Sequence, residues 1–152
     1  MSDADLAAWS ALVRVYQDVL HDVVAALERD AGIDSGMFSV LAHLERASEP
    51  GRLPLNELQR LMYPRFSQPG LSRLVQRMET AGLVERRRDP VDGRATNLVA
   101  TRAGRARFRR ANTTYASAVH EFFGVHLTAA ERKRLIADLD RVGDRLARAR
   151  SA

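Results

Sequence analysis

The hydrophobic pattern of this 152-residue chain departs from a helical period in one segment, and that segment limits the folds that the chain can adopt. Over most of the chain, apolar residues recur every three or four positions, as they do on one face of an α-helix. From Leu83 to Ala100 the period falls to about two, as in β-strands, and Asp92-Gly93 supplies a tight turn. We therefore predict a mainly helical α+β fold that contains one small β-hairpin.

Capping and breaking residues divide the first half of the chain into helices. The spacing predicts a first helix over 3–29, which Gly32 ends, and a second helix that begins after Asp34 as its N-cap. Residues 48–53 are expected to form a turn, and Pro54 is expected in the first turn of a short third helix. This third helix is predicted to pack through Leu55, Leu58, Leu61 and Met62.

The second half has similar boundaries. A fourth helix is expected from near Ser67 to Gly82, which suits the position just past a helix end. Thr101 is expected to cap a fifth helix that runs to about residue 123. Thr128 and Glu131 have the spacing of a capping box for a sixth helix, which is expected to end near residue 148.

These elements form one intertwined domain with two regions. Residues 34–104 hold three helices followed by the hairpin, the order found in a winged helix-turn-helix. Residues 1–33 and 105–152 form long amphipathic helices whose apolar stripes one small chain cannot cover. Apolar patches of that size usually mark an interface, so we expect the flanking helices to form a homodimer.

Arginine is concentrated in one third of the chain. Residues 63–110 hold twelve arginines and four acids, a balance of +8 in a chain whose net charge is +5. Residues 1–62 are acidic, with five bases and ten acids, so a general preference for arginine does not explain the clustering. Localised positive charge predicts a polyanionic partner, and we expect double-stranded DNA.

The fourth helix has one apolar and one polar face. Its apolar residues fall within about 100° of the helical wheel, and they are Leu71, Leu74, Val75 and Met78. The opposite arc holds Pro69, Arg73, Gln76 and Thr80, flanked by Ser72 and Arg77. Arginine can form two hydrogen bonds with guanine and glutamine two with adenine in the major groove. This arc is therefore predicted to read DNA sequence.

The hairpin carries a second group of arginines. Arg86, Arg87 and Arg88 lie on its first strand, so at least one side chain projects from each face. Asp92 and Arg94 flank the glycine at its tip. A charge-assisted bond from Asp92 would hold Arg94 extended, as entry into a narrow minor groove requires.

The segment LSRLVQRMETAGLVERRRDPVDGRA, followed by TRAG at the start of the next helix, resembles the MarR family of bacterial regulators. The resemblance implies a dimeric winged helix-turn-helix repressor on a pseudo-palindromic operator, released by a small aromatic or phenolic ligand. On this match 67–77 is the recognition helix, and Asp92 and Arg94 are the wing pair. The expected DNA-binding residues are Ser67, Gln68, Pro69, Ser72, Arg73, Gln76, Arg77, Arg86, Arg88, Asp92 and Arg94. The chain departs from the family pattern at Pro54, Gly70 and Ala100.

Aromatic residues are the candidates for an effector pocket, although aromatics at helical spacing are more often part of the core. These candidates are Trp9, Tyr16, Phe38, Tyr63 and Phe66. The four histidines are scattered, and we expect no metal site and no cofactor. The chain has no combination of nucleophile, base and orienting residue and no phosphate loop, so we do not expect an enzyme.

Composition leaves three classes of function open. Without cysteine, without an apolar run long enough to span a bilayer, and with an acidic N-terminus, the chain is expected in the cytoplasm, away from membranes. The first class is a ligand-responsive, sequence-specific repressor. The second is an architectural DNA-binding protein that tolerates any sequence, and the third uses the fold only for dimerisation or protein contact.

Overall fold

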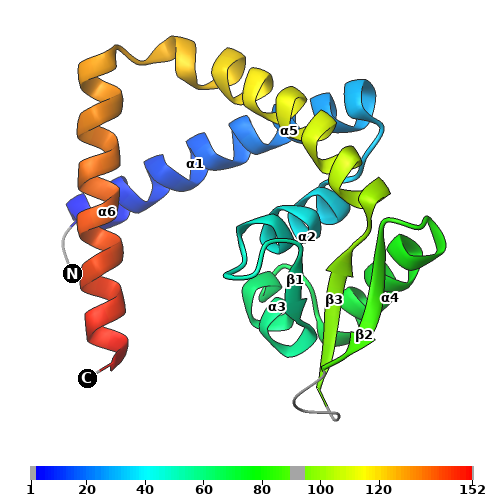
Figure 1. Cartoon of the computed structure of the whole chain (residues 1–152). Helices are drawn as coiled ribbons and strands as arrows, with labels where there is room; N and C mark the ends of the chain where they lie inside the picture. Colours follow the sequence, from blue (N-terminus) through cyan, green and yellow to red (C-terminus); the bar gives the residue numbers. More distant parts are fainter. Residues whose placement is uncertain (1–2, 90–94, 152) are drawn as a thin grey trace. The chain divides into compact units, whose positions relative to one another are not determined.

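The computed structural model describes residues 3–89 and 95–151 and confirms the predicted α+β class (Figure 1). In chain order its elements are α1 (Asp3–Ala26), the π-helical turn η1 (Leu27–Ala31), α2 (Ser35–Arg46), β1 (Arg52–Pro54), α3 (Leu55–Met62), α4 (Gln68–Thr80), β2 (Val84–Arg88), β3 (Thr96–Ala100), α5 (Arg102–Phe122), the 3-10 turn η2 (Gly124–His126) and α6 (Ala129–Ser151). No helix in the described part of the chain is long and apolar enough to cross a membrane.

The chain divides into two compact units. The first, here called the helical unit, comprises Met1–Val23 and Ala116–Ala152. The second, the reader unit, is Val24–Tyr115 and contains α2, α3, α4 and the sheet. The boundaries that the sequence places after residues 33 and 104 remain predictions.

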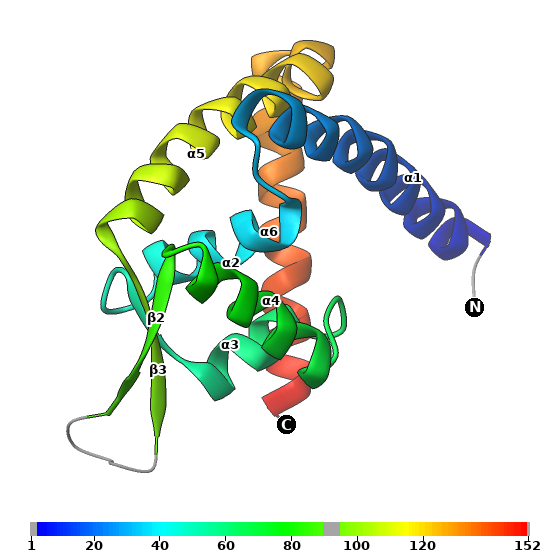
Figure 2. The same cartoon turned by 90° about the vertical axis from the view of Figure 1, so that its right-hand side faces the viewer.

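The reader unit contains a three-stranded antiparallel sheet in the order β1-β3-β2. β2 and β3 form the predicted hairpin, seen beside α4 in Figure 2. β1 was not predicted, and the expected turn over residues 48–53 was wrong for its last two residues. Leu53 of β1 is buried and pairs with Leu98 of β3, so this short strand forms because its central side chain completes the core.

The core of the reader unit lies between its three helices and the sheet. Leu44 of α2, Leu58 of α3, Val75 of α4 and Leu98 of β3 have no exposed surface. Each such side chain contributes roughly 1.5–3 kcal/mol through its removal from water. The prediction that Leu61 also packs into this core was wrong, because 47% of it is exposed.

Most of the predicted helix ends are confirmed. The Asp34 side chain accepts a hydrogen bond from the Met37 amide at 2.9 Å, and Gly32 ends the first helix and its π turn with a positive φ of 58°. Thr128 and Glu131 form the capping box, and hydrogen bonds from Thr128 hold the pKa of the Glu131 carboxyl below its ordinary value. Pro54 is the N-cap of α3 rather than a member of its first turn. α6 continues to Ser151, beyond the expected end.

The TRAG segment joins the end of α4 to the start of α5. The Thr101 hydroxyl accepts a hydrogen bond from the Gly104 amide at 3.0 Å and donates one to the Gly82 carbonyl at 2.6 Å. A Cβ at Gly104 would overlap the backbone carbonyl of Leu83. The threonine therefore caps α5, and the glycine permits the close approach of the α4–β2 turn.

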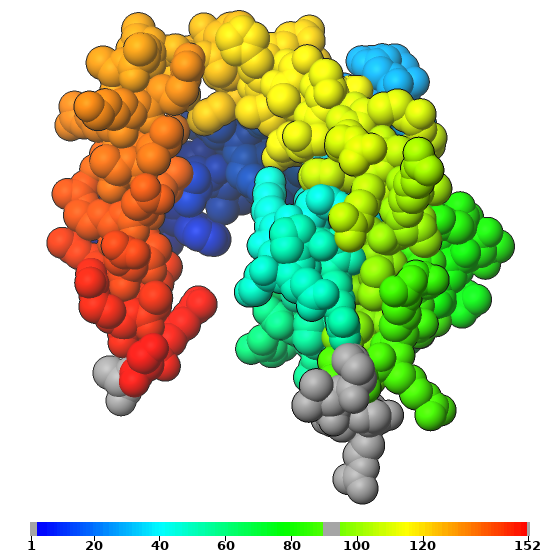
Figure 3. Space-filling model, in the orientation of Figure 1, coloured from blue at the N-terminus to red at the C-terminus, as the bar shows by residue number. Residues whose placement is uncertain are grey.

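The helical unit exposes apolar side chains along its helices. On α1 these include Leu6, Trp9, Leu12 and Tyr16, and on α6 they are Ile136, Leu139, Val142 and Leu146. No residue of α6 is buried, and Figure 3 shows its side chains exposed along the helix. The apolar stripes expected from the sequence are therefore present and lie at the surface.

Candidate nucleic-acid interface

The helix α4 is fixed at both ends, so its exposed face has a defined direction. At its start the Ser67 hydroxyl accepts a hydrogen bond from the Gly70 amide at 3.2 Å. At its end Gly82 takes a φ of 67°, and the Leu83 amide bonds the Met78 carbonyl at 2.9 Å. A Cβ at Gly70 would lie 3.1 Å from the Ser67 hydroxyl, which gives this unusual glycine a local role in the cap.

The two faces of α4 are those predicted from the sequence. The four apolar residues of its inner face are buried to 3% exposure or less. The residues predicted to contact DNA are all exposed on the outer side, and they are Ser67, Gln68, Pro69, Ser72, Arg73, Gln76 and Arg77. Arg73 and Gln76 are three positions apart, roughly 60° around the helix, so both can face one stretch of major groove.

The arginines of strand β2 differ in their partners. Arg86 forms an ion pair with Glu79 of α4, and Arg87 forms one with Glu85. Arg88 is exposed and has no ion-pair partner among the described residues. A carboxylate partner offsets the positive charge with which an arginine attracts a phosphate. Of the two predicted strand contacts, Arg86 and Arg88, Arg88 is therefore the better placed.

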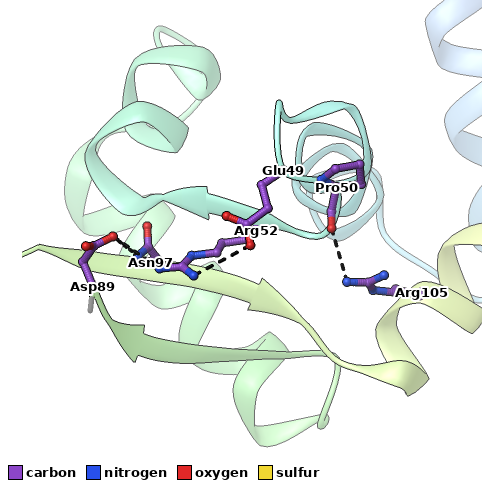
Figure 4. Close-up of polar contacts among 6 residues, drawn as sticks. All are labelled: Glu49, Pro50, Arg52, Asp89, Asn97 and Arg105. Atoms are coloured by element: carbon purple, nitrogen blue, oxygen red, sulfur yellow. Dashed lines mark hydrogen bonds and ion pairs between the residues drawn. The ribbon is translucent and has the colours of Figure 1, made fainter. Parts of the chain in front are cut away.

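A polar cluster joins the three strands at the point where β2 ends. The Asp89 carboxylate accepts hydrogen bonds from the Asn97 amide at 2.8 Å and from Arg52 at 3.3 Å, and Figure 4 shows these side chains converging. The Asp89 amide also bonds the Ala95 carbonyl at 2.9 Å. Asn97 is 2% exposed, so the cluster is anchored in the core. The predicted wing pair, Asp92 and Arg94, lies outside the described residues.

An open hollow adjoins the start of α4. It has a volume of about 560 Å³ and is lined by Arg65, Phe66, Ser67, Gly70, Arg73, Leu74 and Arg77. Two of its arginines belong to the predicted interface, whereas Arg65 does not and was missed by the sequence analysis. The sequence signal for Arg65 is weak, because it lies in the break after Pro64 and only the fold brings it to Ser35 and Ser39 of α2.

The residues predicted to line an effector pocket are not gathered into one site within either unit. Trp9 and Tyr16 are exposed on α1 of the helical unit. In the reader unit Phe38 is buried and stacks on Phe108 and Tyr115, at centroid distances of 5.6 and 4.9 Å. Phe66 lines the hollow and Tyr63 is 73% exposed. The role of these five residues in ligand binding remains a prediction.

Metal-binding groups are not clustered in the described part of the chain. No three histidine or acidic side chains among these residues are arranged to hold a metal ion. His43 lies partly buried on α2, and this burial, with a smaller contribution from Arg46, lowers its pKa. Its side chain therefore favours the neutral form.

Comparison with known proteins points to one family. A model of the MarR family matches residues 31–95. AbsC, a MarR family transcriptional regulator from Streptomyces coelicolor, has a similar structure, with a TM-score of 0.78, 23% identity and coverage of 97% of both chains. A second MarR family regulator from that organism, solved in complex with DNA, gives a TM-score of 0.77 and 25% identity over 96% of this chain and 93% of that one.

A third similar structure is a mutant MarR from E. coli complexed with operator DNA. Its TM-score is 0.69 at 24% identity, over 87% of this chain and 93% of that one. No curated protein sequence matches the chain. These similarities confirm the winged-helix fold and the family resemblance.

Proposed function

We infer that this chain belongs to the MarR family and is a sequence-specific DNA-binding transcription regulator that acts as a repressor. As a member of a family of transcription regulators, it is not an enzyme. The observation that supports the inference best is the outer face of α4, where Arg73 and Gln76 are exposed together on a helix fixed at both ends. A regulator of this kind acts where the DNA is, which in a bacterium is the cytoplasm.

The proposed regulator is a homodimer on a pseudo-palindromic operator. The exposed apolar stripes of α1 and α6 favour this arrangement, because they are the surfaces that a second copy would cover. A twofold dimer presents two copies of α4, and two half-sites about one helical turn apart would match them. Two of the structurally similar MarR family proteins were solved with DNA, which agrees with this use of the fold.

The proposed ligand response is release from DNA by a small aromatic acid. The exposed aromatic residues Trp9 and Tyr16 on α1 are the candidates for contact with it. A ligand that favours one spacing of the two readers would change DNA affinity by a coupling of about 1–3 kcal/mol. Replacing Trp9 or Tyr16 should then alter the ligand response more than ligand-free DNA binding.

The function is tested by comparing two duplexes at one salt concentration. One duplex is selected by the purified protein from a random library, and the other has the same composition in scrambled order. We expect the protein to prefer the selected duplex by at least about a thousandfold. Gln76→Ala removes hydrogen bonds without removing charge, so it should weaken only the selected complex, by about 1–3 kcal/mol per base pair contacted.

The comparison also separates the other two functions. Arg77→Ala is the matched variant, and it should weaken both complexes by similar factors because a phosphate contact carries no sequence information. Equal affinity of the parent protein for both duplexes would identify an architectural DNA-binding protein. No affinity for either duplex would leave dimerisation or protein contact as the use of the fold.

A further inference from the structure

The hollow beside the start of α4 carries positive charge that the described residues only partly offset. Its lining includes Arg65, Arg73 and Arg77 and no acidic residue. The one carboxylate paired with these arginines, among the described residues, is Asp34, which lies 3.3 Å from Arg77. Three positive charges and one negative charge leave the site at about +2, so an anion is the ligand that this surface favours.

Arg65 is held in place without losing its charge. One terminal nitrogen of its guanidinium donates to the Ser35 hydroxyl at 2.6 Å and the other donates to the Ser39 hydroxyl at 3.1 Å. The guanidinium carbon also lies 5.6 Å from the centroid of the Phe66 ring. A guanidinium has five N–H donors, so two bonds to neutral hydroxyls leave three donors for a ligand.

This arrangement differs from that of the arginines on β2. Arg86 and Arg87 have carboxylate partners, which offset their charges within the protein. Arg65 has neutral partners, and Arg73 has no ion-pair partner in the described part of the chain. Arg65 and Arg73 therefore leave positive charge available to an external anion at the hollow, as Arg88 does at the end of β2.

The backbone of α4 adds little to the site. Pro69 has no amide hydrogen, the Gly70 amide donates to the Ser67 hydroxyl, and the Leu71 amide donates to the Ser67 carbonyl at 2.9 Å. The donors that face an anion here are those of the arginine side chains. Guanidinium groups suit phosphate in particular, because their paired N–H groups match two phosphate oxygens.

We propose that this hollow binds one phosphate of the DNA backbone, with Arg65, whose partners are neutral hydroxyls, as the fixed donor. The proposal rests on the proposed function, because it assumes that α4 enters the major groove. The hollow is open and adjoins Ser67 and Arg73, so a phosphate at the edge of that groove can enter while it remains part of a duplex. Such a contact sets the position of Gln76 along the base pairs without reading them.

The test measures how affinity for a scrambled duplex depends on salt, so it needs no knowledge of the operator. Each phosphate contact contributes about 0.9 to the slope of log affinity against log salt concentration. Arg65→Ala should lower the slope by about 0.9 for each reader bound and should weaken the selected and scrambled complexes by the same factor. Arg148→Ala removes an equal charge from an exposed position near the end of α6 and should leave the slope unchanged.

A second variant separates the position of Arg65 from its charge. Ser35→Ala combined with Ser39→Ala keeps the arginine and removes both hydroxyls that hold it. Both complexes should weaken severalfold while the slope stays near that of the parent. Thermal unfolding of each variant in the absence of DNA verifies that the reader unit is folded.

The outcomes distinguish a failure of the proposed function from a failure of the phosphate site. If the parent protein itself shows no salt-dependent binding to duplex DNA, the proposed function fails. If the parent binds and Arg65→Ala keeps the parental slope, or if Arg148→Ala lowers the slope equally, the phosphate site is overturned and the proposed function stands. If the double serine variant binds as the parent does, Arg65 does not act as a fixed donor.

Discussion

Asn97 is a single residue that helps to hold the strands of the sheet together. It is the only polar residue that is buried in the described part of the chain, and its amide reaches the Asp89 carboxylate at the point where β2 ends. Arg52 reaches the same carboxylate from β1. The end of β2 is thus tied to β3 and β1 by one amide, one carboxylate and one guanidinium.

Replacing this amide should destabilise the reader unit. Asn97→Leu fills the buried position but removes one hydrogen bond to the Asp89 carboxylate, and the loss of a hydrogen bond to a charged group costs about 1.5–3 kcal/mol. Urea denaturation measures the change, with Asn112→Ala as the control at an exposed position. A variant as stable as the parent would show that the other partners of Asp89 satisfy its carboxylate fully.

A pH dependence is expected at His43. Burial lowers its pKa in the folded protein, so the unfolded chain takes up a proton first as the pH falls. The contribution of His43 to stability is complete above its ordinary pKa of about 6.5 and declines as the pH falls below it. Unfolding at pH 8 and at pH 5.5 should show a smaller difference in His43→Gln than in the parent. An unchanged difference would assign the acid sensitivity to other groups.

The turn after α4 is in contact with the start of α5. Thr101 bonds the last turn after α4 and caps α5, and Gly104 allows the two to touch. The elements meet through backbone atoms, which cannot move aside as flexible side chains can. The TRAG segment therefore acts as a fixed joint.

A methyl group at Gly104 should push the start of α5 away from the turn between α4 and β2. Gly104→Ala places its Cβ against the Leu83 carbonyl, so it should destabilise the protein although alanine favours helices by about 1 kcal/mol. Gly143→Ala is the control, because a Cβ at that position on α6 meets no atom within 4 Å. The control should gain up to that amount in the free energy of unfolding. Equal effects of the two substitutions would refute the close contact at Gly104.

Elements with long periodic patterns could be predicted from the sequence, whereas contacts between distant segments could not. α2 begins after Asp34 and α4 after Ser67 as expected, because capping residues act within one turn. β1 was missed because three residues show no periodicity and its stability comes from pairing with β3. Arg65 was missed for the same reason, since its partners Ser35 and Ser39 are at least 26 positions away.

At the scale of the whole molecule, the chain combines a reader unit that has its own core with a helical unit that exposes apolar helices. Leu44, Leu58 and Leu98 close the core of the reader unit. In the helical unit, Trp9 is 64% exposed and Ile136 is 56% exposed. The reader unit buries its apolar side chains by itself, whereas the helical unit exposes apolar side chains that the proposed dimer would cover.

Charge on that surface should prevent the proposed dimer. Ile136→Asp combined with Leu139→Asp places two carboxylates in the apolar stripe of α6, where burial without partners is costly. Sedimentation should show a dimer for the parent at micromolar concentration and a monomer for the variant. The variant should also lose most of its affinity for the selected duplex, because only one reader binds at a time. A monomeric parent would contradict both the dimer and the palindromic operator.

The pairing of β1 with β3 limits how early the sheet can form while the protein is being synthesised. Leu53 needs Leu98 as its neighbour, yet α3, α4 and β2 are all translated between them. At about 5–20 residues per second, the ribosome needs roughly 1–4 s to proceed from the end of α4 to Ala100. Throughout that interval β3, the strand that pairs with both β1 and β2, has not yet been synthesised. The three-stranded sheet can therefore form only after its last strand in the sequence, which is its central strand, has been synthesised.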